Sequence, residues 1–94
     1  MLGLAIKANK LVTGTDLVVT NIRKGKVRLV ILASDLAENG REEIESALKK
    51  HPAKVIDIFT SQEISHAIGK ERKVLALTDV GFAKALLKKI NEGV

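Results

Sequence analysis

Few residues in this sequence could act as catalytic groups. Catalysis by a nucleophile needs a serine or cysteine, a histidine and an acid in contact, and the only candidates are Ser65 and His66 with Asp57 or Asp79. Neighbouring residues on a helix do not face each other, so Ser65 and His66 do not form such a pair. Asp79 is also well placed to cap a helix. We therefore expect a protein that is not an enzyme.

Motifs for phosphate and metal binding are incomplete as well. Gly69 and Lys70 match the end of a P-loop, but that motif needs a glycine five positions earlier, where the sequence has Ile64. The chain has no cysteine, and its two histidines, His51 and His66, cannot hold a metal ion by themselves. The sequence therefore predicts neither a metal site nor a cofactor.

One segment could instead bind a ligand through its backbone. The short run Leu11 to Thr13 ends at Gly14, and an amphipathic helix is predicted to follow, capped by Thr13 or Thr15. The first turn of a helix has N–H groups without partners in the helix, and these can bind a phosphate or another acceptor. Glycine lets a ligand approach the backbone closely, whereas the alternative interpretation of Gly14 is a plain turn. Residues 14–17 are named the glycine corner below.

The charge distribution favours an anionic partner. Sixteen Lys and Arg against eleven Asp and Glu give a net charge of +5 and a pI near 9.7. Up to residue 28 there are six cations and one acid, Asp16, whereas residues 35–45 hold five acids and one cation, Arg41. Segregated positive charge suits phosphate backbones, and an ordinary basic surface is the alternative.

The two aromatic residues limit how a nucleic acid could be recognised. Phe59 and Phe82 lie in patterns typical of a core, so they do not offer faces on which single-stranded bases could stack. Recognition would have to use backbone amides, small side chains and cations against a preformed shape. Structured RNA is often bound in this way.

Apolar and capping patterns predict the elements that position the glycine corner. Strands are predicted over residues 11–13, 27–33, 54–59 and 74–77, the second of them central and covered on both faces. A first helix is predicted over residues 2–10 and a second from the glycine corner to Gly25. Two more begin at capping boxes, one running from residues 39–42 to His51 and the other from residues 60–63 to Gly69. A last helix is predicted after a cap at Thr78 or Asp79.

The order of these elements predicts the fold class. Apolar residues at helical spacing predict the buried faces, which include Val18, Val19 and Ile22 in one helix and Ile64, Ala67 and Ile68 in another. Strands that alternate with helices favour an α/β protein. We expect one domain over residues 1–94, a three-layer α/β/α sandwich around a small mixed sheet of roughly four strands.

Several motifs follow one another along the whole chain. They are Leu4-Ala5-Ile6-x-Ala8-x-Lys10-Leu11-Val12-x-Gly14, then Arg23-x-Gly25, then Lys26-x-x-Leu29-Val30-Ile31-Leu32-Ala33-x-Asp35, and then Ile64-x-x-Ala67-x-Gly69-Lys70. In this order they resemble the kink-turn RNA-binding ribosomal protein superfamily, which includes the proteins L-seven-Ae and L-thirty-e. Within that superfamily the chain is similar to the small bacterial YlxQ-type branch.

The resemblance implies an α/β/α fold and an RNA site at Gly14, the start of the next helix and the loop after Gly69. Relatives that grip kink-turns carry the signature Gly-x-Asn-Glu-x-x-Lys, or a version with Lys-Gln in its middle. Their polar pair reads the guanine edges of sheared G·A pairs, and the lysine contacts phosphate. Here Asp16, Leu17 and Thr20 occupy the matching positions, so the glycine is present while the polar pair and the lysine are replaced.

Our hypothesis is a non-enzymatic protein that binds structured RNA, either ribosome-associated or kink-turn-like. The predicted RNA-binding residues are Lys10, Gly14, Thr15, Asp16, Thr20, Gly69, Lys70 and Arg72, with a basic extension at Arg23, Lys24, Lys26 and Arg28. The alternative is a protein-interaction module on the same fold that has lost kink-turn specificity. No apolar run is long enough for a signal peptide or a membrane span. We expect a cytoplasmic monomer that binds neither DNA nor a membrane.

Overall fold

The computed structural model describes residues 10–93, and within them the protein forms a mixed sheet of four strands. The strands are β1 (Leu11–Thr13), β2 (Leu29–Leu32), β3 (Lys54–Ile56) and β4 (Val74–Leu77). Their order across the sheet is β1-β4-β2-β3, with β4 antiparallel to both of its neighbours and β2 parallel to β3. The helix predicted for residues 2–10 falls outside the described residues, apart from Lys10.

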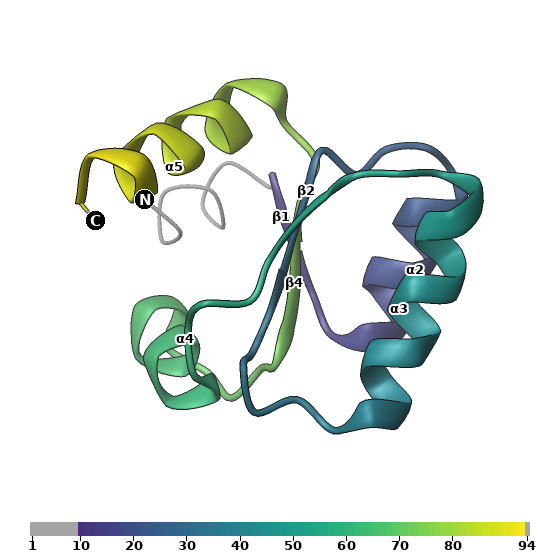
Figure 1. Ribbon diagram of the computed structural model, residues 1–94, viewed down its shortest axis with the longest axis horizontal. Coiled ribbons are helices and arrows are strands. Elements are labelled where there is room, and N and C mark those ends of the chain that lie inside the picture. The colour runs from purple at the N-terminus through teal and green to yellow at the C-terminus, as the bar shows by residue number, and fades with distance from the viewer. Residues whose placement is uncertain (1–9, 94) are drawn as a thin grey trace.

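Helices cover both faces of this sheet (Figure 1). They are α2 (Thr15–Arg23), α3 (Glu38–Lys50), α4 (Ser61–Ile68) and α5 (Val80–Gly93). The pair α2 and α3 lies on one face, and the pair α4 and α5 lies on the other. The predicted three-layer α/β/α sandwich with a mixed sheet is therefore confirmed.

Each face of the sheet has its own apolar core because side chains alternate along a strand. In β2, Leu29 and Ile31 pack toward α4 and α5, whereas Val30 and Leu32 pack toward α2 and α3. All four are buried, as expected for a central strand with a continuous apolar run. The predicted buried residues of α2, namely Val18, Val19 and Ile22, are confirmed.

Two predicted helix N-caps were wrong. The helix α2 has Gly14 at its N-cap, because Thr13 is paired with Leu75 in the sheet and Thr15 is already the first helical residue. The helix α3 begins at Glu38, one residue before the proposed capping box at 39–42, and no side chain caps it. Leu36 packs against both cores, which brings the chain into the helix early and leaves the expected cap inside the first turn.

Other helix ends agree with the sequence. Thr60 and Glu63 form the predicted capping box of α4, and Gly69 ends that helix in the left-handed conformation. Asp79 rather than Thr78 caps α5, since its Oδ2 accepts from the Phe82 N–H at 3.0 Å.

Three predictions about the extent of elements need correction. Strand β2 is shorter than the predicted 27–33 at both ends, whereas β3 begins at Lys54 as predicted and ends at Ile56 instead of residue 59. Ala67 of α4 is exposed, whereas Ile64 is buried and Ile68 is half-buried. The short helix α4 therefore buries a narrower face than the apolar spacing predicted.

Candidate functional site

The glycine corner turns the chain from β1 directly into α2. Gly14 has φ 93° and ψ 145°, a backbone region that is essentially restricted to glycine. Its N–H donates to the Val74 carbonyl at 2.9 Å, and its carbonyl accepts from the Val18 N–H at 3.0 Å. The first bond continues the sheet and the second begins the helix, so one residue fixes the junction of both.

The first turn of α2 has three backbone donors without acceptors. Within residues 10–93, the N–H groups of Thr15, Asp16 and Leu17 form no hydrogen bond, and no side chain caps the helix. At the start of α4, in contrast, the Ser61 N–H donates to Asp35 at 2.8 Å and the Glu63 N–H to Thr60 at 3.1 Å. Since the N-cap residue of α2 is a glycine, a ligand oxygen can reach its donors directly.

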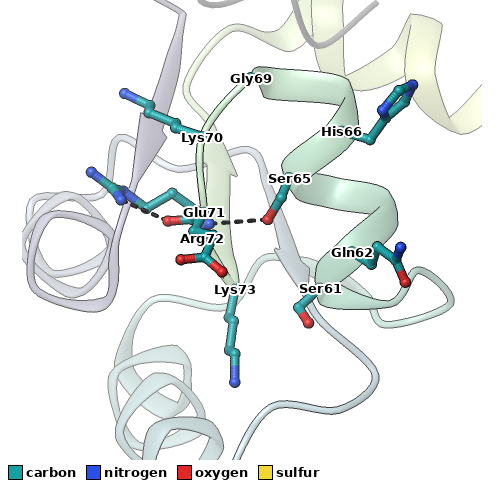
Figure 2. Close-up of a pocket in the computed structure, with 9 residues that line it drawn as sticks. All are labelled: Ser61, Gln62, Ser65, His66, Gly69, Lys70, Glu71, Arg72 and Lys73. Carbon is teal, nitrogen blue, oxygen red and sulfur yellow. Dashed lines mark hydrogen bonds between the residues drawn. The ribbon is translucent and has the colours of Figure 1, made fainter.

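A hollow lies between α4 and the loop that follows Gly69 (Figure 2). Its volume is about 1020 Å³. It is lined by Ser61, Gln62, Ser65, His66, Gly69, Lys70, Glu71, Arg72 and Lys73. The Arg72 N–H donates to Ser65 Oγ at 3.4 Å, and Arg72 Nη1 donates to the Glu71 carbonyl at 2.6 Å. The side chains of Lys70 and Arg72 extend away from α4, and both are exposed.

The glycine corner and this loop meet at one end of the sheet. β1 and β4 are antiparallel, with Thr13 opposite Leu75, so the end of β1 lies beside the start of β4. The bond from Gly14 to Val74 joins the corner to the residue that follows Lys73. This is the lower end of the sheet in Figure 1. The structure therefore brings together the two parts of the predicted site.

Asp16 and Thr20 lie on the exposed face of α2 beside the corner. The Thr20 hydroxyl donates to the Asp16 carbonyl at 2.9 Å, so its proton is used within the helix. Leu17 is 57% exposed, although it is apolar. The face that follows the glycine therefore offers one carboxylate, one hydroxyl oxygen and one apolar side chain.

The remaining predicted cations lie elsewhere. The Lys10 carbonyl accepts from the Thr78 N–H at 3.0 Å, which places Lys10 at the opposite end of β1 from Gly14. Arg23 is the last residue of α2, nine residues long, and thus stands about 13 Å along the helix axis from the corner. The predicted basic extension Arg23, Lys24, Lys26 and Arg28 follows that end of α2. These residues do not join the corner.

Lys73 lines the hollow, although the sequence analysis did not select it. It ends the same charged loop as Lys70 and Arg72, so the run of charge was the available signal. The bond between Ser65 and the Arg72 backbone depends on how α4 folds back on the loop, and local sequence carries no signal for it.

Asp35 ties the loop after β2 to the start of α4 and so supports one wall of the hollow. Its Oδ2 accepts from the Ser61 hydroxyl at 2.6 Å and its Oδ1 from the Ser61 N–H at 2.8 Å. These bonds, together with the nearby Lys73 ammonium, lower the pKa of Asp35 below its ordinary value of 3.8. The charged carboxylate is therefore the form that the fold stabilises.

This lowered pKa predicts a pH dependence of stability. Because the folded-state pKa lies below 3.8, the contribution of Asp35 is present above that pH and is lost as the pH falls through the folded-state pKa. We expect Asp35→Asn to lower the melting temperature at neutral pH, and the difference from wild type to shrink under acid. Thermal melts across that range measure it, with the exposed Glu43→Gln as the control. A constant difference at all pH values would contradict the assignment.

Residues 10–93 contain no group of three histidine or acidic side chains that could hold a metal ion. No helix among them is long and apolar enough to cross a membrane.

Comparison with known proteins places the chain in a family. Residues 1–87 match the Ribosomal protein L7Ae/L30e/S12e/Gadd45 family, and the chain belongs to that family. It is 37% identical over 93 residues to the RNA-binding protein YlxQ of Enterococcus faecium, covering 99% of this chain and 89% of that protein. It is 35% identical over 88 residues to the RNA-binding protein YlxQ of Bacillus subtilis (strain 168), covering 93% and 88% of the two chains.

A solved structure shares the fold of this chain. A protein from Bacillus halodurans matches with a TM-score of 0.86 and 35% identity, over 96% of this chain and 92% of that chain. The predicted resemblance to the superfamily and to its YlxQ-like branch is therefore confirmed.

Proposed function

We propose that this protein binds structured RNA through the glycine corner and the loop after Gly69, without catalysis. The observation that carries the proposal is the set of three unpartnered N–H groups at residues 15–17, held beside an exposed cationic loop by the bond from Gly14 to Val74. The names of the two YlxQ relatives, which describe RNA binding, support the same ligand.

Each part of the site suits a different part of an RNA. The N–H groups of the corner donate hydrogen bonds to a phosphate oxygen or a base carbonyl, since the helix N-terminus carries partial positive charge. Lys70, Arg72 and Lys73 contact backbone phosphates. The Asp16 carboxylate accepts hydrogen bonds from the ring and amino N–H groups of a guanine. This contact differs from those that the family signature makes. A bent stem or an internal loop presents both features side by side.

The finer identity of the RNA follows from the same residues. An internal loop in ribosomal RNA, or a related kink-turn, fits a site that has no aromatic platform for single strands. The cytoplasm is the compartment where such RNA would be met. Because Asp16, Leu17 and Thr20 replace the kink-turn signature, we expect weaker discrimination of sheared G·A pairs than in relatives that carry it.

A titration tests the proposal. Fluorescence anisotropy compares a standard kink-turn stem, the same stem without its G·A pairs, and a DNA duplex of similar length. Tighter binding to the kink-turn stem supports kink-turn recognition, and equal binding to both RNA stems supports structured RNA alone. No binding to either RNA would overturn the proposal.

Removing the loop cations should weaken this binding in a salt-dependent way. Each phosphate contact contributes about 0.7 to 0.9 to the logarithmic salt slope, so we expect the double variant Lys70→Gln with Arg72→Gln to lower the slope by about 1.4 to 1.8. The matched control is Lys84→Gln with Lys89→Gln, which removes the same charge from exposed positions on α5. Equal loss in both variants would assign the effect to net charge rather than to the site.

One observation favours a second candidate, a protein-docking surface at the same place. Leu17 is more than half exposed beside the corner, and an exposed apolar side chain can contribute to a protein interface. This candidate predicts partners that stay bound after nuclease treatment and are released by Leu17→Lys. The RNA proposal predicts that nuclease removes what is bound.

A further inference from the structure

The end of the sheet opposite the glycine corner carries exposed cations at the starts of three strands. Leu77 of β4 pairs with Leu11 of β1 on one side and with Leu29 of β2 on the other, and Leu29 pairs with Lys54 of β3. By this register, Lys10, Arg28 and Lys54 therefore lie side by side along the same edge of the sheet, at the strand ends. The bond from the Arg28 N–H to the Leu77 carbonyl, at 2.8 Å, fixes that level. This is the upper end of the sheet in Figure 1.

Two helices end at the same place and add further cations. Arg23 lies in the last turn of α2, and Lys49 and Lys50 lie in the last turn of α3. The two helix ends are close, since a Cβ built on Gly25 would stand 3.9 Å from His51 Nδ1. We name the following set the basic pole: Lys10, Arg23, Lys24, Lys26, Arg28, Lys49, Lys50 and Lys54.

The basic pole has almost no acidic counterpart. All eight residues are exposed, and within the described chain both ion pairs belong to Arg41, which is not one of them. Asp79 is the acidic residue that follows a strand at this end, and its Oδ2 is used by the Phe82 N–H. Asp35 and Asp57 instead follow strands at the opposite end. Within residues 10–93, none of the eight cations therefore forms an ion pair that would offset this concentrated positive charge.

Helix dipoles explain only part of this concentration. Cations in the last turn of a helix are stabilised by its partial negative charge, which accounts for Arg23, Lys49 and Lys50. Strand ends have only small dipoles, so the same effect does not account for Lys10 or Lys54. Mutual repulsion opposes the gathering of these charges, and a polyanion from outside would relieve it.

We propose that the basic pole is a second RNA-binding surface, which contacts the backbone phosphates of a duplex segment and lets one chain hold RNA at both of its ends. The inference goes beyond the proposed function and takes from it only that the ligand is RNA. From β1 to β3 the strand starts span three strand spacings, about 14 Å. Six of the eight cations are lysines, which act as flexible point charges on phosphate rather than as readers of base edges.

A pair of charge-matched variants tests the location. The probe is a plain RNA duplex without an internal loop, titrated at several salt concentrations by fluorescence anisotropy. We expect Lys26→Gln with Arg28→Gln to weaken duplex binding and to lower the salt slope by about 1.4 to 1.8. Lys84→Gln with Lys89→Gln should leave the slope unchanged. Equal effects of the two pairs would overturn the proposal.

Two further arms separate this inference from the proposed function and from another ligand. The variant Lys70→Gln with Arg72→Gln should still bind the plain duplex. The variant Lys26→Gln with Arg28→Gln, the pole variant, should still bind a short kink-turn stem. If the wild-type protein binds the plain duplex but not the kink-turn stem, the proposed function is wrong, whereas the inference about the basic pole still holds. If the pole variant loses binding to vesicles of anionic phospholipid but keeps binding to the RNA duplex, the surface binds a membrane and the inference is wrong.

Discussion

Replacing Gly14 by alanine is expected to lower the free energy of unfolding by about 1–3 kcal/mol. The cost is conformational rather than steric, because a Cβ at this position would meet no atom within 4 Å. At φ 93° and ψ 145° an alanine is strained, and relief of the strain would break either the bond to Val74 or the first bond of α2. Chemical denaturation of wild type and variant measures the difference.

Gly69 provides the matched control for this substitution. It too has open space around a built Cβ, but its φ of 78° and ψ of 14° lie in the left-handed helical region, which asparagine adopts readily. We expect Gly69→Asn to cost less than about 1 kcal/mol. Equal costs at the two glycines would show that the corner conformation stores no special strain.

The Gly14→Ala substitution should also impair RNA binding while the protein is still folded. If the corner relaxes, the N–H groups of residues 15–17 change direction, and hydrogen bonds weaken steeply with misalignment. We expect the affinity of Gly14→Ala for a kink-turn stem to fall by about one to two orders of magnitude, as one lost charge-assisted hydrogen bond of about 1.5–3 kcal/mol implies. Affinity equal to that of wild type would mean that these donors do not contact the RNA.

Local patterns predicted the core because local and tertiary preferences agree there. The apolar spacing in α2 required a buried stripe at Val18, Val19 and Ile22, and the sheet supplies the surface that covers it. The continuous apolar run of β2 required two covered faces, and helices lie over both. The capping box at Thr60 involves residues three positions apart, so neighbouring residues alone determine it.

The arrangement of the charges could not be predicted in the same way. Counting cations along the chain grouped Lys10 and residues 23–28 with Gly14, although strand β1 and helix α2 place those cations at the opposite end of the sheet from Gly14. The insertion of β4 between β1 and β2 then placed Lys70 and Arg72 beside the corner. Strand order depends on long-range pairing, so no local pattern in the sequence reveals which charged loops become neighbours.

Helix α3 illustrates how a tertiary contact displaces a local signal. Asn39 and Glu42 match a capping box, yet the helix starts at Glu38 with Ala37 at its N-cap. Leu36 is half-buried and packs against both cores, and partial burial of a leucine contributes about as much as the roughly 1 kcal/mol of a typical cap. Packing against the cores therefore competes with the local signal for where this helix begins.

Restoring the kink-turn signature should produce a large gain in affinity on this scaffold. The variant combines Asp16→Asn, Leu17→Glu and Thr20→Lys, which changes the net charge by only +1. All three positions are exposed, so we expect a change in stability within about 0.5 kcal/mol. The new glutamate also keeps a negative charge in the first turn of α2, where the helix dipole favours it.

The expected gain follows from the contacts that the new side chains make. A well-placed polar contact to a base edge is worth about 1–3 kcal/mol, and the lysine adds a phosphate contact. We therefore expect the triple variant to bind a kink-turn stem at least about tenfold more tightly than wild type, with little gain on the stem that lacks its G·A pairs. Titration of both stems measures it, and Leu17→Ala alone is the control for removing the exposed leucine. A gain that is equal on both stems would come from charge alone. No gain on either would mean that the corner of this chain does not present its first helical turn to RNA as the kink-turn binders do.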